Sequence, residues 1–175
     1  MTQLEKLETT LDDVLNKKAP FKIPEDSRKT LAGAMWWLSL LFGILQLWLV
    51  WHLWHLGHVA DAWVDYANSI SSVYGVAPTV HHLGLFYYLA LITLGITGVL
   101  SLLAAPGLKA MKKAGWDLLF YALLVNAVYG VVAVFTSYGG FGNLIGALVG
   151  SVVGAYLLFQ VRGQFMKSHV AEHKA

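Results

Sequence analysis

The stretch from Leu31 to His58 contains no aspartate, glutamate, lysine or arginine, and it constrains the fold more than any other part of the chain. Its sequence is LAGAMWWLSLLFGILQLWLVWHLWHLGH. The hydrocarbon core of a bilayer is about 30 Å thick, and a helix needs about 20 apolar residues to cross it. The stretch therefore predicts a membrane-spanning helix over roughly residues 31–56.

Three further apolar runs follow, each bounded by proline or glycine. They cover roughly residues 83–104, 116–136 and 141–161. The composition agrees with a membrane protein, since 57% of the residues are hydrophobic and only 13% are charged, whereas soluble domains carry about 25% charged residues. We therefore expect an all-α fold. It is a four-helix transmembrane bundle over residues 24–162, followed by a cytoplasmic tail over 163–175.

The N-terminal residues predict a shorter helix of a different kind. Large apolar side chains recur at steps of three and four between charged positions, which is the pattern of an amphipathic helix. They are Leu4, Leu7, Leu11, Val14 and Leu15. Pro20 and Pro24 interrupt any continuous helix, so residues 1–23 form an amphipathic helix and linker. This helix lies on the membrane surface or against the base of the bundle; alternatively, it docks a protein partner or forms a short coiled coil.

The distribution of positive charge predicts the orientation. All 12 lysines and arginines lie in the N-terminal segment, in the loop between the second and third spans, or in the tail. Residues 57–82 and 137–140 contain none. Because cytoplasmic loops are enriched in lysine and arginine, we expect both termini in the cytoplasm and two loops outside, in a multi-pass protein of the cell (inner) membrane.

Small and amide residues indicate how the spans pack. Gly142, Gly146, Gly150 and Gly154 form a glycine zipper along the fourth span. Such ladders allow close helix contact in lipid, either within the chain or in a homo-oligomer. Gln46 and Asn126 lie near mid-membrane, where an unpaired amide is costly. We expect them to face the bundle and to pair with each other as a structural contact.

Five of the seven histidines lie at the predicted outer ends of the first two spans. They are His52, His55, His58, His81 and His82. At about 100° per residue, His52 and His55 share a face with Trp48 and Trp51, which is typical of an aromatic belt at the lipid headgroups. We therefore expect these two to face lipid.

The other histidines form a candidate ligand site. If the helix continues past Gly57, His58, Asp61 and Asp65 fall within about 60° of one another, and His81 and His82 can approach from the second span. Imidazoles with carboxylates suit Zn²⁺, Mn²⁺ or Fe²⁺. A bis-histidine haem and a protonation switch are the alternatives. The rest of this outer segment, over residues 59–78, predicts an interfacial amphipathic helix over the mouth of the bundle.

The segments GWDLLFYALLVNAVYGVV and GALVGSVVGAYLLFQVRGQF, the turn from Pro106 to Trp116 and the ending Tyr156 to Arg162 resemble a group of small four-span bacterial membrane proteins. These occur especially in reduced-genome candidate-phylum lineages and share a short charged N-terminal helix. The resemblance implies four spans in a bacterial membrane and no particular activity. The histidine-rich outer segment has no counterpart in that pattern.

No sequence signature of an enzyme is present. The chain lacks a Walker loop, a dinucleotide fingerprint, GxSxG and HExxH, and it has no cysteine. No charged residue lies at mid-membrane, which argues against an ion-coupled transporter, and a net charge of +2 predicts no nucleic-acid partner. We therefore expect a non-enzymatic scaffold or accessory subunit with no cofactor, in contact with lipid and a membrane-protein partner. A metal- or haem-binding protein is the alternative, and a small homo-oligomeric channel or carrier is the third.

Overall fold

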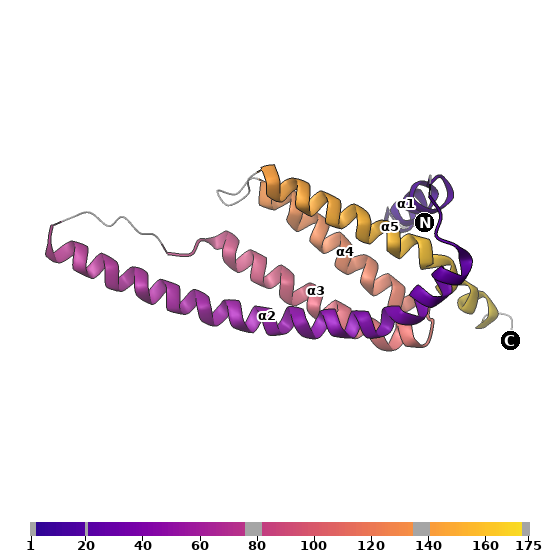
Figure 1. Ribbon diagram of the computed structural model, residues 1–175, viewed down its shortest axis with the longest axis horizontal. Coiled ribbons are helices and arrows are strands. Elements are labelled where there is room, and N and C mark those ends of the chain that lie inside the picture. The colour runs from indigo at the N-terminus through magenta and orange to yellow at the C-terminus, as the bar shows by residue number, and fades with distance from the viewer. Residues whose placement is uncertain (1–2, 20, 76–81, 135–140, 173–175) are drawn as a thin grey trace.

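A computed structural model describes residues 3–19, 21–75, 82–134 and 141–172. Within these ranges it describes the side chains at every position except 17, 134, 141–148 and 167–172. The protein is all-helical, and no strand occurs among the described residues. The elements are α1 (Gln3–Asp12), a π-helical turn η1 (Asp13–Lys17), α2 (Glu25–Val73), α3 (Leu85–Lys109), α4 (Lys113–Val134) and α5 (Phe141–Glu172), as Figure 1 shows.

Three helices in the described part of the chain are long and apolar enough to cross a membrane. They are α2, α3 and the stretch Lys113–Ala133 of α4. The fourth predicted span coincides with a helix, α5, but the side chains of its first turns lie outside the described residues. Length and composition thus indicate a membrane protein with three candidate spans, and the four-span bundle stays a prediction.

Helix α2 is much longer than the predicted span over residues 31–56. It has 49 residues, and a rise of 1.5 Å per residue makes it about 74 Å long, more than twice the thickness of a bilayer core. Gly57 lies within α2 and does not break the helix. Its lack of a side chain lets Tyr87 of α3 pack closely against α2 at this point, since a Cβ at Gly57 would lie 3.0 Å from Tyr87 Cε1. The interfacial helix predicted for residues 59–78 is therefore wrong in its placement. Residues 59–73 continue α2 in a straight line beyond α3 (Figure 1).

The α3–α4 connection also differs from the prediction. Pro106 and Gly107 were expected to end the second span, yet α3 continues to Lys109. A proline in the last turn removes only one helical hydrogen bond, and the turn closes at Met111, whose φ is 53°. The two helices touch immediately after it, since a Cβ on Gly115 would lie 2.4 Å from the backbone nitrogen of Leu108.

The tightest packing lies at the end of the bundle that holds this α3–α4 turn, which we call the base. Trp116 stacks on Phe120 at 5.4 Å between ring centroids and meets Phe159 edge-on at 5.2 Å. Its indole Nε1 donates to the carbonyl of Leu158 over 2.9 Å. Leu108 of α3 is fully buried in the same cluster. The base therefore joins α3, α4 and α5.

The N-terminal segment docks on the base through α5. Gln160 donates to the carbonyl of Leu15 over 2.9 Å, and the hydroxyl of Tyr156 donates to the carbonyl of Phe21 over 2.6 Å. Helix α1 turns Glu8 inward while Leu4 and Leu7 are exposed. Helix α1 therefore lies against the base, one of the predicted arrangements; a contact of its exposed leucines with lipid stays a prediction.

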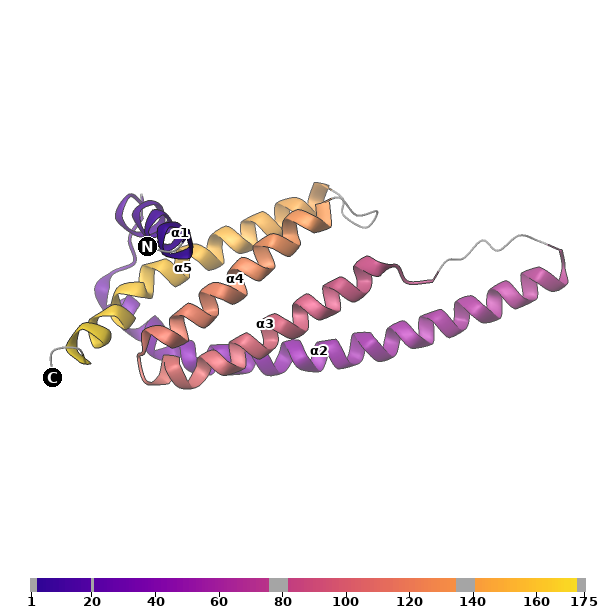
Figure 2. The ribbon, with the colours of Figure 1, turned by 180° about the vertical axis from the view of Figure 1, so that it is seen from behind.

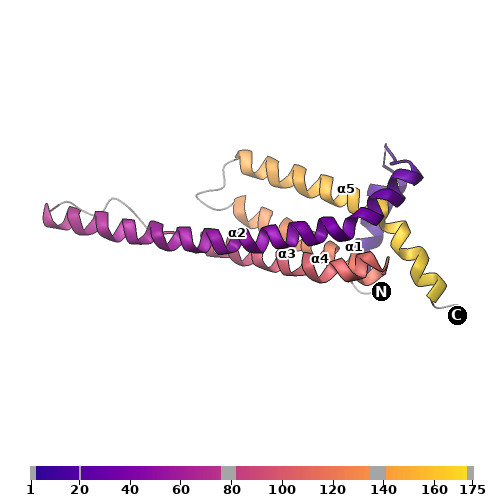
Figure 3. The same cartoon turned by 60° about the horizontal axis from the view of Figure 1, so that its bottom comes forward.

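Away from the base, α4 and α5 diverge from the first pair of helices, α2 and α3, as Figure 2 shows. Helix α3 packs against both α2 and α4, and Figure 3 shows α5 set apart from α2 beyond the base. Close contact within the first pair occurs at Gly98, whose added Cβ would lie 3.1 Å from Leu47 Cδ2. The divergence leaves α2 facing α4 and α5 across an open space away from the base.

Candidate functional site

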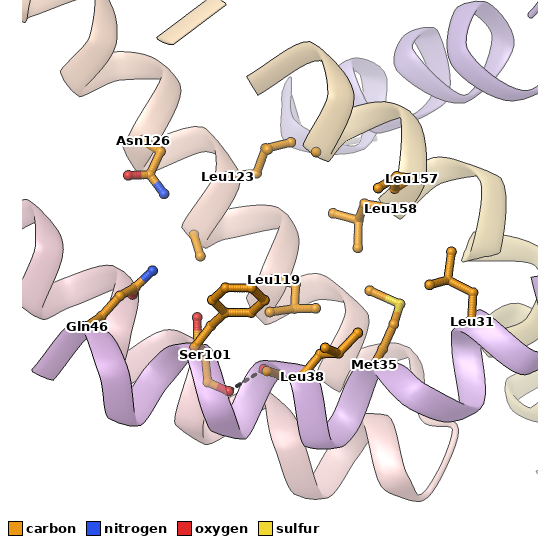
Figure 4. A pocket seen from close by; sticks show the side chains of 14 residues that line it. Leu31, Met35, Leu38, Gln46, Ser101, Leu119, Leu123, Asn126, Leu157 and Leu158 are labelled. Atoms are coloured by element: carbon orange, nitrogen blue, oxygen red, sulfur yellow. Dashed lines mark hydrogen bonds between the residues drawn. The ribbon is translucent and has the colours of Figure 1, made fainter. Parts of the chain in front are cut away.

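A groove of about 380 Å³ lies between α2 on one side and α4 and α5 on the other. Figure 4 shows its walls, which are largely leucine. The lining residues are Leu31, Met35, Leu38, Ser39, Phe42, Gln46, Ser101, Leu119, Ala122, Leu123, Asn126, Gly154, Leu157 and Leu158. Four of them are polar, and their hydrogen bonds decide what the groove can bind.

Two of the polar side chains are satisfied inside the α2–α3 pair. Ser39 Oγ donates to the carbonyl of Ser101 over 2.6 Å, and Ser101 Oγ donates to the carbonyl of Thr97 over 2.8 Å. The oxygen of the Gln46 carboxamide accepts from Thr97 Oγ1 over 3.2 Å. These bonds fix the Gln46 side chain at the edge of the groove.

The two carboxamides predicted to pair share the groove without bonding to each other. Figure 4 shows Gln46 and Asn126 pointing into the space between the helices from opposite walls. Within the described residues, neither the amide nitrogen of Gln46 nor any side-chain atom of Asn126 takes part in a hydrogen bond. The groove therefore presents amide groups with hydrogen-bonding capacity that the described residues leave unused.

The glycine zipper is described only in its second half. A Cβ at Gly154 would lie 3.4 Å from Leu123 of α4, and one at Gly150 would meet nothing within 4 Å. Gly154 thus forms part of the groove wall and Gly150 faces outward. Gly142 and Gly146 lie outside the residues whose side chains are described, so a homo-oligomer through this helix stays a prediction.

At the end of the bundle opposite the base, Asp61 of α2 forms hydrogen bonds with residues at the start of α3. Its carboxylate accepts from the backbone N–H of Leu83 over 3.0 Å and from the hydroxyl of Tyr88 over 3.3 Å. His82 Nδ1 lies 3.3 Å from the same carboxylate, and His82 Nε2 lies 3.4 Å from Asp65. The hydrogen bond from the N–H of Leu83, together with the interaction with His82, holds the pKa of the Asp61 carboxyl below its usual value of 3.8. Asp61 lies beyond the span predicted over residues 31–56.

Three of the five predicted metal ligands are therefore neighbours. His82 places one ring nitrogen near each of the carboxylates of Asp61 and Asp65. His58 instead contacts the Trp54 ring edge-on at 4.8 Å, and His81 lies outside the described residues. In the part of the chain that the structure describes, no three histidine, aspartate or glutamate side chains are grouped as a metal requires.

His52 and His55 lie where the helical wheel placed them. Each ring lies tilted against that of the tryptophan four residues earlier, with centroid distances of 4.0 Å to Trp48 and 4.3 Å to Trp51. Their Nδ1 atoms lie 3.2 and 3.0 Å from the carbonyls of the same tryptophans. Both tryptophans are exposed. This face of α2 is therefore exposed, and its contact with lipid stays a prediction.

A second cluster of charges, at the base, was not predicted. Arg162 donates to Glu8 over 2.5 Å, lies 3.5 Å from Asp12 and stands over the Trp116 ring at 5.5 Å. Lys113 lies 2.8 Å from Asp117, four residues along α4, and 3.8 Å from Glu8. Local periodicity carries no signal for the contacts of Glu8 with Lys113 and Arg162, which are far from it in the chain.

Comparison of the chain with protein-family models, with curated proteins and with solved structures finds no match. The geometry of the chain itself therefore carries the functional argument.

Proposed function

We propose that the protein is a multi-pass protein of the cell (inner) membrane that acts as a non-enzymatic scaffold or accessory subunit. Its groove receives a transmembrane helix of a partner membrane protein. The observation that carries this proposal is the pair of carboxamides, Gln46 and Asn126, with bonding capacity left over in an otherwise apolar groove. In hydrocarbon, an unsatisfied polar group is unfavourable, and interhelical hydrogen bonds from asparagine and glutamine stabilise helix association.

The shape and chemistry of the groove favour a helix over a lipid chain. An acyl chain would fill the apolar part but would leave the amides without hydrogen bonds. A helix bearing serine, threonine, asparagine or glutamine at the right depth satisfies them, and Gly154 lowers the wall so that a backbone can approach. The small polar network of Ser39, Ser101 and Thr97 holds Gln46 in place for this contact.

The orientation proposed with this function has both termini in the cytoplasm. Lysines and arginines gather around the base, with Lys113 and Arg162 in its ionic cluster, and residues 57–82 contain none. This asymmetry follows the positive-inside rule. In this orientation the groove lies in the cytoplasmic half of the bilayer, since its α2 wall runs from Leu31 to Gln46.

A photoreactive crosslinker tests the proposal in native membranes. It replaces Phe42 or Leu157, which line the groove, and, as a control, Ile96, which is exposed on α3 outside the groove. We expect one discrete crosslinked partner from the two groove positions and none from Ile96, with the yield reduced by Asn126→Leu. Equal crosslinking at all three positions would refute the proposal. A product of twice the chain mass would assign the groove to a second copy instead.

A ligand site at the outer end is the second candidate, because His82 stands between Asp61 and Asp65. The ligand is a divalent transition metal, or haem if a further histidine joins. Elemental analysis and a visible absorption spectrum of protein purified in mild detergent test it. Near-stoichiometric metal or a Soret band, lost in His82→Ala, supports this function. A colourless and metal-free protein counts against it.

A further inference from the structure

The outer part of α2 carries a stripe of apolar side chains that are exposed among the residues the structure describes. The stripe consists of Leu56, Val59, Trp63, Tyr66, Ile70 and Val73, of which Trp63 is 66% and Val73 81% exposed. The steps between them alternate between three and four residues. This is the a and d pattern of a heptad repeat, which forms the seam between helices in a coiled coil.

The stripe points away from the protein's own bundle. Gly57 and Asp61 are the positions through which this part of α2 contacts Tyr87 and Leu83 at the start of α3. At 100° per residue they lie about 150° to 170° around the helix from the centre of the stripe. The outer part of α2 therefore contacts α3 through the face opposite the stripe, and the stripe is free to meet a partner.

The membrane surface is not available to cover the stripe. Helix α2 is continuous through Gly57, and its apolar stretch over residues 31–56 already extends for about 39 Å, enough to cross the bilayer core. Residues 59–73 then continue outward for about 22 Å, in the direction seen in Figure 2. Lying on the membrane would require a break at Gly57, where Tyr87 packs against the helix.

We propose that this stripe is the interface with a second copy of the chain, in a parallel dimer of the outer segments. Copies inserted in one bilayer with the same topology hold α2 parallel and at the same depth, so identical stripes meet in register. The stripe is only about two and a half heptads long, but anchoring in the membrane keeps the local concentration of the second copy high.

The residues that flank the stripe fit a second copy. Between Val59 and Val73 the positions next to the seam are small and uncharged, so two identical helices can approach there without like-charge repulsion. They are Ala60, Ala62, Ala67 and Ser69. The negative charges of the segment, Asp61 and Asp65, lie on the other side of the helix, where both meet His82.

A hollow on the stripe has the form that such a seam requires. It measures about 380 Å³ and is lined by Val59, Ala62, Trp63 and Tyr66. These four positions, at steps of three, one and three, are the four that make one hole for a knob of the facing helix in a parallel coiled coil. Trp63 and Tyr66 meet edge-on at 6.0 Å and form its walls. The Trp63 side chain of the second copy is the knob that this hole receives.

The chain has no cysteine, so single introduced cysteines report the contact directly. Full-length variants Val59→Cys and Val73→Cys place a thiol on the seam, and Ser72→Cys places one on the opposite face beside Val73. In lipid vesicles under mild oxidation, we expect the seam variants to form disulfide-linked dimers at least about tenfold faster than Ser72→Cys. The difference should persist when the protein is diluted in lipid.

Equal rates for the three variants, or dimers only from Ser72→Cys, overturn the proposal. A seam substitution, Trp63→Asp in the Val59→Cys background, should abolish the crosslink while the helical circular dichroism stays unchanged, since Trp63 makes no buried contact in the monomer. A nitroxide at residue 66 gives an independent readout. Dipolar broadening supports the dimer, whereas relaxation by lipid-dissolved oxygen without broadening contradicts it.

Discussion

Replacing Gly115 with alanine should separate α3 from α4 at the base. A Cβ there would lie 2.4 Å from Leu108 N, 2.6 Å from the carbonyl carbon of Gly107 and 2.9 Å from the carbonyl oxygen of Ala104. All three are backbone atoms, so no side-chain rotation relieves the contact. The helices must move apart by about 1 Å to restore an ordinary contact distance, and overpacking of this kind costs about 1–3 kcal/mol.

Gly163→Ala is the matched control for this substitution. Gly163 also lies in a helix, but an added Cβ there meets nothing within 4 Å. Alanine at an open helical position stabilises by about 0.5–1 kcal/mol through backbone entropy. Gly115 and Gly163 both lie in helices, so both variants gain this entropy term. The two variants should therefore differ by the overpacking cost alone, about 2 kcal/mol in the free energy of unfolding, which is roughly a 30-fold difference in the equilibrium constant.

The assay is unfolding of the detergent-solubilised protein by increasing mole fractions of sodium dodecyl sulfate, followed by tryptophan fluorescence and helical circular dichroism. Trp116 is fully buried beside the substituted position, so its emission reports the base. Gly154→Ala, where the added Cβ would meet Leu123 at 3.4 Å, should fall between the two. If Gly115→Ala were as stable as Gly163→Ala, the close α3–α4 crossing would be refuted.

Three further predictions address the other contacts. Arg162→Met should release α1, since Glu8 loses its nearest cation; faster hydrogen exchange of the α1 amides than in the exposed-site control Lys29→Met checks this. Because the pKa of Asp61 is lowered in the folded state, its contribution to stability is present above pH 3.8 and is lost as the pH falls through the lower folded value. The hydrogen-exchange protection factor of the Leu83 amide, which donates to Asp61, should follow this profile. In Asp61→Asn this protection factor should be independent of pH. Asn126→Leu should leave the free energy of unfolding of the isolated protein unchanged or slightly higher, and it should lower the yield of the partner crosslink. A large loss of stability would contradict the open groove.

Much of the helical layout could be predicted from local sequence. Apolar runs and bounding glycines and prolines located α3, α4 and α5 to within a few residues at their starts. The 100° wheel placed His52 and His55 on the exposed face of α2. Both results depend on properties that a helix carries without its neighbours.

The parts that were missed depend on contacts between distant residues. Gly57 was ambiguous because glycine permits both a break and a close contact, and only the position of Tyr87 decides between them. The ion pair of Glu8 with Arg162 joins the two ends of the chain. The groove arises from the angle between two helix pairs, so the sequence could bring Gln46 and Asn126 to one depth but could not show that they remain apart.

The length of α2 has a mechanical consequence. The helix is packed against the base at Ala32, which is fully buried, and runs unbroken to Val73, a lever arm of about 60 Å. A tilt of about 10° at the base displaces the outer tip by about 10 Å, whereas the same tilt of a helix that ended at the membrane surface would move its tip by little more than half as much. A small rearrangement at the base thus becomes a displacement of molecular size at the far end of α2, with no segment between them that needs to refold.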